Sequence, residues 1–388
     1  YGDACLAVSD HVLMMTNMNR ILAADWQSGR IVAEAGLTLA ELIEVALPRG
    51  WFPPVTPGTK FITLGGAVAN DVHGKNHHVM GTFGRHVGSL TLYRTDTGAS
   101  TISRTQAPEL FAATIAGLGL TGVILSVELQ LRPVSSARIQ ERRIRFRGLD
   151  EFFDLVAGYD QDYEYTVAWI DCAASGKTAG RGHLIVGNHA PHGALRCEQP
   201  GALKVPIDPP FSLVNPFTLR AFNAVYYRSQ LRREVQRSAG YDSFFYPLDR
   251  ISGWNRMYGR AGFQQYQCIV PDATSRESIR SVVRAIARSG TGSFLAVLKK
   301  CGALTSPGLL SFPMPGVSLA LDFPQSARTV ALFGELDALV HDAGGRLYPA
   351  KDAHMTAGHF QSAYPAWRSV EALRDPRLMS RFWQRVTQ

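Results

Sequence analysis

The alternation of apolar and polar residues predicts the main elements of the first third of the chain. A two-residue period predicts strands at 29–36 and 121–133 and a hairpin at 89–104 that turns at the sequence TDTG. Helical spacing of apolar residues predicts helices at 38–50 and 108–117. These strands and helices do not alternate in the order that a Rossmann fold requires, so the pattern indicates an α+β fold.

The rest of the chain shows the same two patterns. Apolar residues recur at helical spacing in 275–290 and 326–348, which predicts two helices. Three short runs predict strands: 165–171, 293–300 and 317–324. Proline and glycine are frequent in 51–66 and in 187–217, where we expect irregular structure.

Local signals fix some element ends. Thr38 and Glu41 have the separation of a capping box, and Pro48 with Gly50 is typical of a helix end. The chain has 388 residues, which suits two domains.

Composition narrows the class of protein. The chain is 46% hydrophobic and 19% charged, so it can bury a large core. Its net charge of +8 is scattered and comes without a nucleic-acid-binding motif, so we expect no nucleic acid partner. A positive surface suits an anionic substrate or an acidic membrane face.

The cysteine count and the hydropathy pattern bear on location. Five cysteines without a CxxC sequence favour reduced thiols over a disulfide framework. The sequence contains no transmembrane run and no signal peptide, so we expect a cytoplasmic protein or one held peripherally at a bacterial inner membrane. Its first residue is Tyr1 rather than Met, so we expect the natural protein to begin earlier.

The sequence HGKNHH (73–78) admits two interpretations. His73 and His77 are four residues apart and would share a helix face, as zinc ligands can. Gly74 and Asn76 are poor helix formers, however, and no carboxylate or cysteine cluster stands nearby. The alternative is a loop whose histidines bond to a ligand or to backbone.

Two glycine-rich stretches invite a nucleotide-binding interpretation. GLGLTG (117–122) matches the dinucleotide-binding pattern, but a helix precedes it and a strand follows, so a tight connection fits better. In PGTKFITLGGAVAND (57–71), small residues would let backbone N–H groups approach phosphate oxygens, and threonine hydroxyls would add donors. A purely structural loop is the alternative at both places.

Polar residues in the second half suggest a ligand site. Gln265 and Gln267 alternate onto one strand face, which fits sugar recognition or, alternatively, an edge strand facing water. Lys351 follows a tight glycine turn and is either functional or a surface charge.

Taken together, several segments resemble one family. These are YGD (1–3) and the segments 57–87, 109–122, 254–267, 312–324 and 344–352. Their order resembles the polyprenylphosphoryl-ribose oxidases, flavoproteins of the vanillyl-alcohol-oxidase and para-cresol-methylhydroxylase type. The resemblance runs over essentially the whole chain, and DVHGKNHH together with YPAKD is its most specific part.

The resemblance implies a two-domain flavoprotein. A PCMH-type FAD-binding domain would comprise residues 1–137 and a C-terminal return at 346–388, and an antiparallel-sheet substrate domain would comprise 138–345. The implied FAD contacts are Tyr1, Gly2, Gly58, Thr59, Thr63, Gly66, Asn70, His73, Gly74, Asn76, His77, Gly122, Ile124, Tyr348, Ala350 and Lys351. Members carry RGxGRS before YGD, a turn that wraps the FAD pyrophosphate and lies outside this sequence. No histidine stands in the remaining part, so the FAD is expected to be non-covalent, and no metal is implied.

The implied reaction is oxidation of the 2′-hydroxyl of a polyprenyl-phosphate ribose to a keto sugar. The implied catalytic residues are Lys351 as the base, Tyr1 beside it, and His73 near the flavin ring. A lysine must be neutral to accept a proton, so its site must lower its pKa. The implied substrate contacts are Trp169, Gln265, Gln267, Lys299 and Ser318. A partner keto-sugar reductase would complete a ribose-to-arabinose epimerisation.

The chain departs from the family at three pocket positions. Mycobacterial members have Asn and Cys where this chain has Ser318 and Ala320, so compounds that react with that thiol are not expected to modify this chain. Phe245 stands where the family has Tyr.

Two other functions remain open from the sequence. An aldonolactone or alditol oxidase of the same fold would pass electrons directly to oxygen. A degenerate relative would bind a sugar lipid without turning it over.

Overall fold

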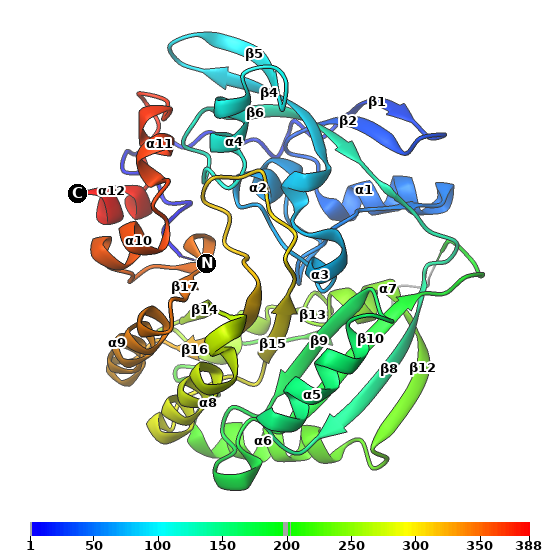
Figure 1. The fold of residues 1–388 in the computed structure, drawn as a ribbon, viewed down its shortest axis with the longest axis vertical. Coiled ribbons are helices and arrows are strands. Elements are labelled where there is room, and N and C mark those ends of the chain that lie inside the picture. Colours follow the sequence, from blue (N-terminus) through cyan, green and yellow to red (C-terminus); the bar gives the residue numbers. More distant parts are fainter. Residues whose placement is uncertain (1, 197–200, 202) are drawn as a thin grey trace.

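A computed structural model describes residues 2–196, 201 and 203–388, and it confirms the α+β class (Figure 1). The N-terminal part, blue to cyan in Figure 1, contains five described strands in the antiparallel order β1-β2-β6-β4-β5. These strands are β1 (Ile21–Asp25), β2 (Arg30–Glu34), β4 (Val87–Arg94), β5 (Gly98–Ser103) and β6 (Val123–Gln130). The helices of this part are α1 (Leu39–Ala46), α2 (Leu64–Ala69), α3 (His77–Met80) and α4 (Pro108–Thr114). A short pair joins β3 (Trp51–Phe52) to β7 (Arg132–Pro133).

The second part is built on a larger antiparallel sheet. Its described strands run in the order β12-β8-β10-β9-β15-β16-β14-β17. They are β8 (Arg138–Phe146), β9 (Tyr165–Ile170), β10 (Gly182–His189), β12 (Glu234–Gly240), β14 (Phe263–Pro271), β15 (Ala296–Cys301), β16 (Gly316–Pro324) and β17 (Arg346–Leu347). The helices of this part are α5 (Leu149–Tyr159), α6 (Pro216–Arg228), α7 (Tyr241–Phe245), α8 (Asp272–Ser289) and α9 (Ala327–Asp342). A parallel pair joins β11 (Leu203–Lys204) to β13 (Ile251–Ser252).

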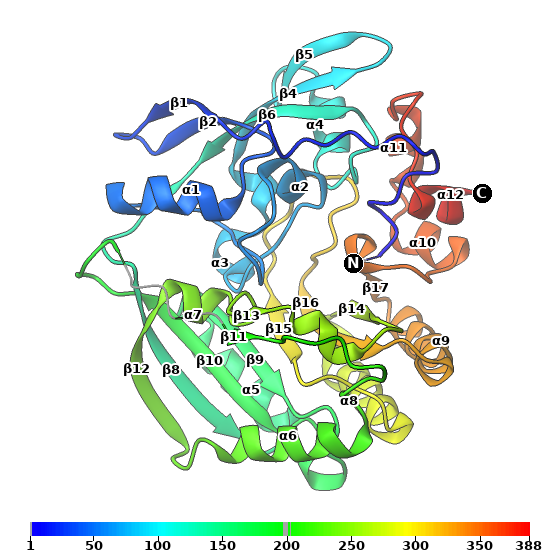
Figure 2. The same ribbon diagram turned by 180° about the vertical axis from the view of Figure 1, so that it is seen from behind.

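Helices α5, α8 and α9 cover one face of the large sheet, as Figure 1 shows. Alternate residues of β14 and β16 point into this core, among them Tyr266, Cys268, Leu319 and Leu321. The intervening residues must therefore point to the opposite face. Seen from behind, α7 lies over that opposite side and α6 runs across the lower end of the sheet (Figure 2).

The end of the chain returns to the N-terminal part. The three last helices, α10 (Ala357–Ala363), α11 (Trp367–Ala372) and α12 (Arg381–Thr387), lie beside it in both views (Figures 1 and 2). Asp375 accepts hydrogen bonds from the backbone N–H and the hydroxyl of Thr95, each at 2.7 Å. Ala7 pairs with Ser380 in an isolated antiparallel bridge.

Most predicted elements are confirmed. The capping box of Thr38 and Glu41 is present at α1, and the hairpin at TDTG is β4–β5. Gly290 ends α8 with a φ of +69°. No helix in the described part of the chain is long and apolar enough to cross a membrane.

One alternative and one expectation are wrong. The strand that carries Gln265 and Gln267 is not an edge strand, because β17 pairs with its outer side. The stretch 51–66, expected to be irregular, contains β3 and the start of α2. The helix expected in 326–348, followed by Gly344 and Gly345, is confirmed as α9: it ends at Asp342, and Gly344 turns the chain with a φ of +72° into β17.

Candidate functional site

One face of the large sheet carries the predicted substrate residues. Strand pairing places four side chains in one row across β9, β15, β16 and β14: Trp169, Val297, Ala320 and Gln267. Residues two positions along the same strands share that face: Gln265, Lys299, Ser318 and Asp322. All five predicted substrate residues therefore lie on one surface, and Asp322 joins them.

A loop of the N-terminal part presses onto this face. Gln267 Nε2 donates a hydrogen bond to His73 Nε2 at 3.0 Å, and Lys299 Nζ donates to the carbonyl of Gly74 at 2.9 Å. A Cβ at Gly74 would lie 2.7 Å from the carbonyl oxygen of Thr56, so a larger residue would push the loop out of place. The predicted cofactor loop and the predicted substrate face thus meet directly.

His73 and His77 are neutral and do not share a helix. His77 and His78 lie in α3, whereas His73 pairs with Thr82 in an isolated bridge. Burial lowers the pKa of His73 well below its usual value and lowers the pKa of His77 to about 3. No group of three possible metal ligands occurs among the residues that the structure describes. The helical zinc arrangement considered for His73 and His77 is therefore not formed.

Three buried polar atoms at the meeting point have no partner among the described residues. His73 Nε2 accepts from Gln267, which assigns the ring proton to Nδ1, and that atom is unpaired. His77 Nδ1 accepts from the backbone N–H of Gly302 at 3.2 Å, and its Nε2 is unpaired. Gln265 Oε1 is the third such atom. Unpaired buried donors and acceptors are costly, so these atoms indicate a polar ligand at this place.

The stretch 57–71, which is predicted to bind phosphate, already forms hydrogen bonds within itself. Thr63 Oγ1 accepts the N–H of Gly66 at 3.1 Å and caps α2, and the Asn70 amide donates to the carbonyl of Gly66 at 2.9 Å. Gly58 is exposed, and a Cβ there would meet nothing within 4 Å. Gly58 and Thr59 therefore offer open backbone and a half-buried hydroxyl, which fits a dinucleotide phosphate.

The other predicted cofactor residues have varied surroundings. Asn76 is buried, with its amide donating to the carbonyl of Pro54 at 2.9 Å. Gly122 has a φ of +153°, and Ile124 packs its side chain into the core of the small sheet. Ala350 packs beside Tyr348, whose hydroxyl donates to the Asn70 carbonyl at 2.8 Å. Tyr1 lies outside the described residues.

Lys351 stands at the end of the same face. It follows Tyr348 in a short 3-10 turn, and its backbone N–H donates to the Tyr348 carbonyl at 3.0 Å. Burial lowers the pKa of Lys351 to about 8, and the nearby Asp322 carboxylate opposes that shift. Burial raises the pKa of Asp322 to about 6, and Gln265 Nε2 donates to its carboxylate at 2.6 Å. A lysine of this kind is partly neutral near physiological pH and can accept a proton.

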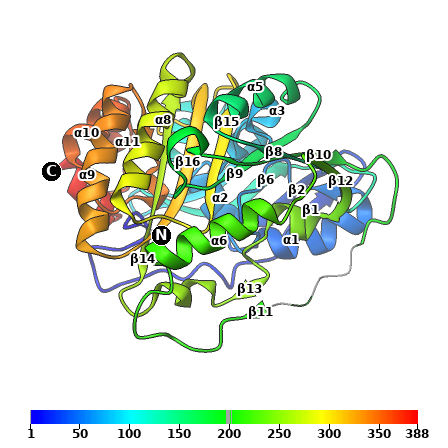
Figure 3. The ribbon, with the colours of Figure 1, turned by 90° about the horizontal axis from the view of Figure 1, so that it is seen from below.

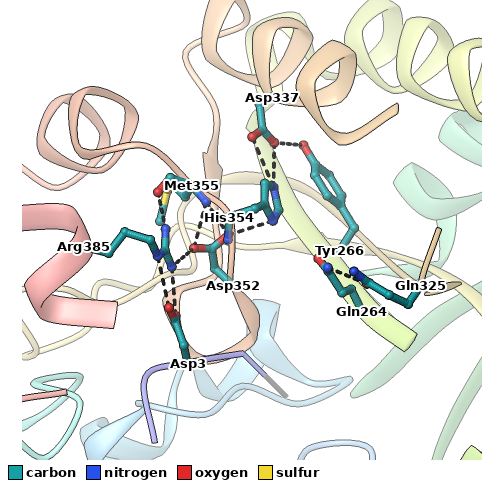
Figure 4. Close-up of polar contacts among 9 residues, drawn as sticks. All are labelled: Asp3, Gln264, Tyr266, Gln325, Asp337, Asp352, His354, Met355 and Arg385. Atoms are coloured by element: carbon teal, nitrogen blue, oxygen red, sulfur yellow. Dashed lines mark hydrogen bonds and ion pairs between the residues drawn. The ribbon is translucent and has the colours of Figure 1, made fainter. Parts of the chain in front are cut away.

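A buried ionic network fixes the segment that carries Lys351 (Figure 4). Arg385 Nη2 bonds to Asp3 and to Asp352, each at 2.9 Å, so α12 holds both ends of the described chain together. His354 lies between Asp352 and Asp337, at 3.2 Å from each. The hydroxyl of Tyr266 also donates to Asp337 at 3.0 Å, which connects the network to β14 (Figure 4).

Sequence reasoning did not single out several of these residues. Asp322 could have been found as a second polar position after Ser318 in the alternation of 317–324. Lys75 also belongs to the loop at 73–78: its Nζ lies 4.6 Å from the ring centre of Phe244, and burial lowers its pKa to about 7. The Arg385 network leaves no local signal, because its members are far apart in the sequence.

The structure places Phe245 and the thiols away from reactive positions. Phe245 is fully buried in an aromatic cluster, with its ring 4.8 Å from that of Tyr165, so it belongs to the core and does not line the predicted substrate face. The free thiols of Cys172, Cys268 and Cys301 are buried, and burial raises the pKa of each to about 11 or 12. Thiolates react and thiols do not, so we expect these three to resist alkylation in the folded protein, as mass spectrometry after iodoacetamide treatment would show.

Comparison with known proteins agrees with this geometry. Residues 1–101 match the sequence profile of the FAD binding domain family. The chain is 36% identical over 97% of its length to the decaprenylphosphoryl-β-D-ribose oxidase of Mycolicibacterium smegmatis, covering 84% of that protein. It is 34% identical to an uncharacterized protein of Streptomyces coelicolor, over 88% of this chain and 96% of that one. L-gulonolactone oxidase of Scyliorhinus torazame matches only 35% of the chain, at 30% identity over 31% of its own length.

The likeness to the first two relatives covers both parts of the fold, including the loop at His73 and the strand that carries Gln265 and Gln267. The buried neutral histidines and the half-buried Lys351 fit the FAD that the family profile requires. The chain therefore belongs to the decaprenylphosphoryl-β-D-ribose oxidase family and is an FAD-dependent oxidoreductase.

Proposed function

We propose that this protein oxidises the 2′-hydroxyl of a polyprenyl-phosphate ribose to the keto sugar. The observation that carries the proposal is the single polar face on which Gln265, Gln267, Lys299 and Asp322 meet Lys351 and His73. Amides and a carboxylate suit sugar hydroxyls, and the lysines suit a phosphate.

Each residue of this face has a separate role in the oxidation of the alcohol. Bound FAD would supply the acceptor for the hydride that leaves C2′. Lys351 accepts the proton of the 2′-hydroxyl, so the C–H and O–H bonds are replaced by a C=O bond. Lys299 supplies positive charge beside the loop at Gly74, and Gln265 and Gln267 orient the ribose. His73, held by Gln267, fixes the loop next to the reacting atoms and supplies one N–H donor.

The proposal also includes the division into two domains, a partner enzyme and contact with a membrane. Residues 1–137 with 346–388 would form the FAD-binding domain and 138–345 the substrate domain, supported by the contacts of α10–α12 with the N-terminal part. The keto product needs a reductase that returns a hydride to the other face of C2′, so a partner keto-sugar reductase would complete a ribose-to-arabinose epimerisation. A lipid-linked substrate also requires peripheral contact with a membrane.

A visible spectrum of the full-length protein tests the proposal. Purified protein should show the absorption of oxidised flavin, and anaerobic addition of polyprenylphosphoryl ribose should bleach it. A colourless protein would support a non-catalytic sugar-lipid-binding protein instead. Bleaching by an aldonolactone, followed by rapid reoxidation in air with release of peroxide, would support the aldonolactone oxidase.

The pH dependence of the reaction should report on Lys351. Its pKa of about 8 predicts that kcat/KM rises with pH and levels off above that value, because only neutral lysine accepts a proton. The Asp322 carboxylate favours protonated Lys351, so Asp322→Asn should lower the pKa of Lys351 and move the rise to lower pH.

A matched control removes a remote negative charge. Glu335 is exposed on α9 and pairs with Arg288, so Glu335→Gln should leave the pH profile unchanged. A profile of Asp322→Asn that rises at the same pH as the wild type would show that Asp322 does not act on the base.

A further inference from the structure

Helix α6 carries an apolar face that no described part of the protein covers. Leu219 and Asn223 are buried on its inner side. Phe217 and Val225 are 81% and 70% exposed, and Ala221 between them is also exposed. Positions four residues apart share one face of a helix, so these three form an outward apolar stripe. Figure 3 shows α6 at the surface, across the lower end of the large sheet.

The segments before and after α6 also carry exposed apolar side chains. Ile207 and Phe211 before the helix are 69% and 68% exposed, and Leu231 after it is 86% exposed. We call these residues, together with Phe217 and Val225, the apolar belt. Exposed apolar residues that are frequent along one surface segment are typical of interaction surfaces.

The charge around the apolar belt is positive. Residues 203–233 contain five basic side chains and one acidic side chain, Asp208, which pairs with Arg256 at 3.3 Å. Arg220, Arg228 and Arg232 form no ion pair with any described residue. A helix with apolar residues on one face and arginines beside it is typical of segments that lie in the interface of an anionic membrane.

The inner side of α6 contacts the substrate face. The ring of Tyr226 lies 4.5 Å from that of Trp169, edge to face. Phe222 lies 4.7 Å from Phe294, whose carbonyl accepts the Trp169 indole N–H at 2.9 Å. Trp169 is one end of the row that leads to Gln267, so α6 separates the apolar belt from the substrate face by the thickness of one helix.

We propose that the apolar belt docks on an anionic phospholipid surface and places the end of the substrate face nearest Trp169 at the membrane. This inference rests on the proposed lipid-linked substrate. Docking there lets the polyprenyl chain stay in the bilayer while the sugar phosphate reaches Lys299 and Lys351. The arginines contact lipid phosphates, and Phe217 and Val225 enter the acyl boundary.

Co-flotation of the full-length, FAD-loaded protein with vesicles tests the proposal. The wild type should bind vesicles of phosphatidylcholine and phosphatidylglycerol in a 2:1 mixture, and higher salt should weaken the binding. Phe217→Ser with Val225→Ser should reduce the bound fraction by about tenfold, because both apolar anchors are lost. The matched control is Val330→Ser on α9, which is 59% exposed and should bind as the wild type does.

Two outcomes would overturn the docking surface. One is vesicle binding by the double variant equal to that of the wild type. The other is a wild type that binds no anionic vesicles but dimerises through Phe217 and Val225, which would assign the belt to a second copy of the chain. Equal binding to pure phosphatidylcholine would overturn the role of the arginines.

The rate of flavin bleaching with a short-chain and with a long-chain substrate distinguishes failure of the docking surface from failure of the proposed function. A water-soluble short-chain ribosyl phosphate should bleach the flavin of the wild type and of the double variant at the same rate. The double variant should be slower only with the long-chain substrate in vesicles. If the short-chain substrate fails to bleach the wild type, the proposed function fails, whereas vesicle binding still decides the docking surface.

Discussion

Lys351→Ala should retain bound FAD and lose substrate-driven bleaching by at least about a thousandfold, within the range that a general base contributes. Lys351 lies where the substrate face ends, and burial has already lowered its pKa to about 8. Alanine can neither accept the hydroxyl proton nor donate a hydrogen bond to the sugar. Stopped-flow measurement of flavin bleaching under anaerobic conditions gives the rate directly.

Two further variants distinguish the role of Lys351 as a base from its role as a positive charge. Lys351→Arg keeps a cation but cannot release its proton, so it should be nearly as slow as Lys351→Ala. Lys300→Ala removes a lysine from β15 whose side chain points to the opposite face of the sheet and lies near Asp160, so it should bleach normally. Bleaching by Lys351→Arg within tenfold of the wild-type rate would assign Lys351 a purely electrostatic role.

Local signals in the sequence predicted the elements whose causes are local. The capping box of Thr38 and Glu41 and the hairpin at TDTG depend on neighbouring residues only, and both are present. The segment at Gly65 and Gly66 has a composition that disfavours a helix, yet α2 forms there. A Cβ at Gly65 would lie 3.0 Å from that of Ala35, so close packing against the chain after β2 overrides the local preference.

Strand order depends on partners that are distant in the sequence. The outer neighbour of β14 is β17, about eighty residues later, so nothing near Gln265 and Gln267 could show that their strand is interior. The alternation of Gln265 and Gln267 did predict a shared face, because side-chain direction follows from the strand period alone. Asp322 became part of the site only through its pairing with Gln265.

At the candidate site, the contacts of the histidines also depend on residues that are distant in the sequence. Their four-residue spacing allowed a shared helix face, whereas Gly74 and Asn76 favoured a loop; His73 and His77 do not share a helix, and Gly74 lies against Thr56. The resemblance placed His73 near the flavin ring, which stays a prediction. The contact with Gln267 supports it, and a sequence pattern cannot provide such a contact.

Arg385→Met should destabilise the folded protein by about 3 kcal/mol, because it leaves the carboxylate of Asp352 buried without its cation. Asp352 follows Lys351 directly, and its side chain is 1% exposed. Arg385 also holds Asp3, whose neighbour Gly2 fits so tightly that a Cβ there would lie 2.5 Å from the Asp352 carbonyl oxygen. Thermal unfolding should therefore begin at a lower temperature, and flavin should be released earlier during heating.

Two further variants test whether Arg385 stabilises the protein through the carboxylate of Asp352. Arg381→Met removes an exposed arginine one turn earlier in α12 and should change stability by no more than about 0.5 kcal/mol. In an Asp352→Asn background, the buried charge that Arg385 compensates is absent, so Arg385→Met should cost clearly less than it does in the wild type. An equal cost in both backgrounds would show that Arg385 acts through packing on Phe382 and not through the carboxylate, and the Lys351 segment would then be held by His354 instead.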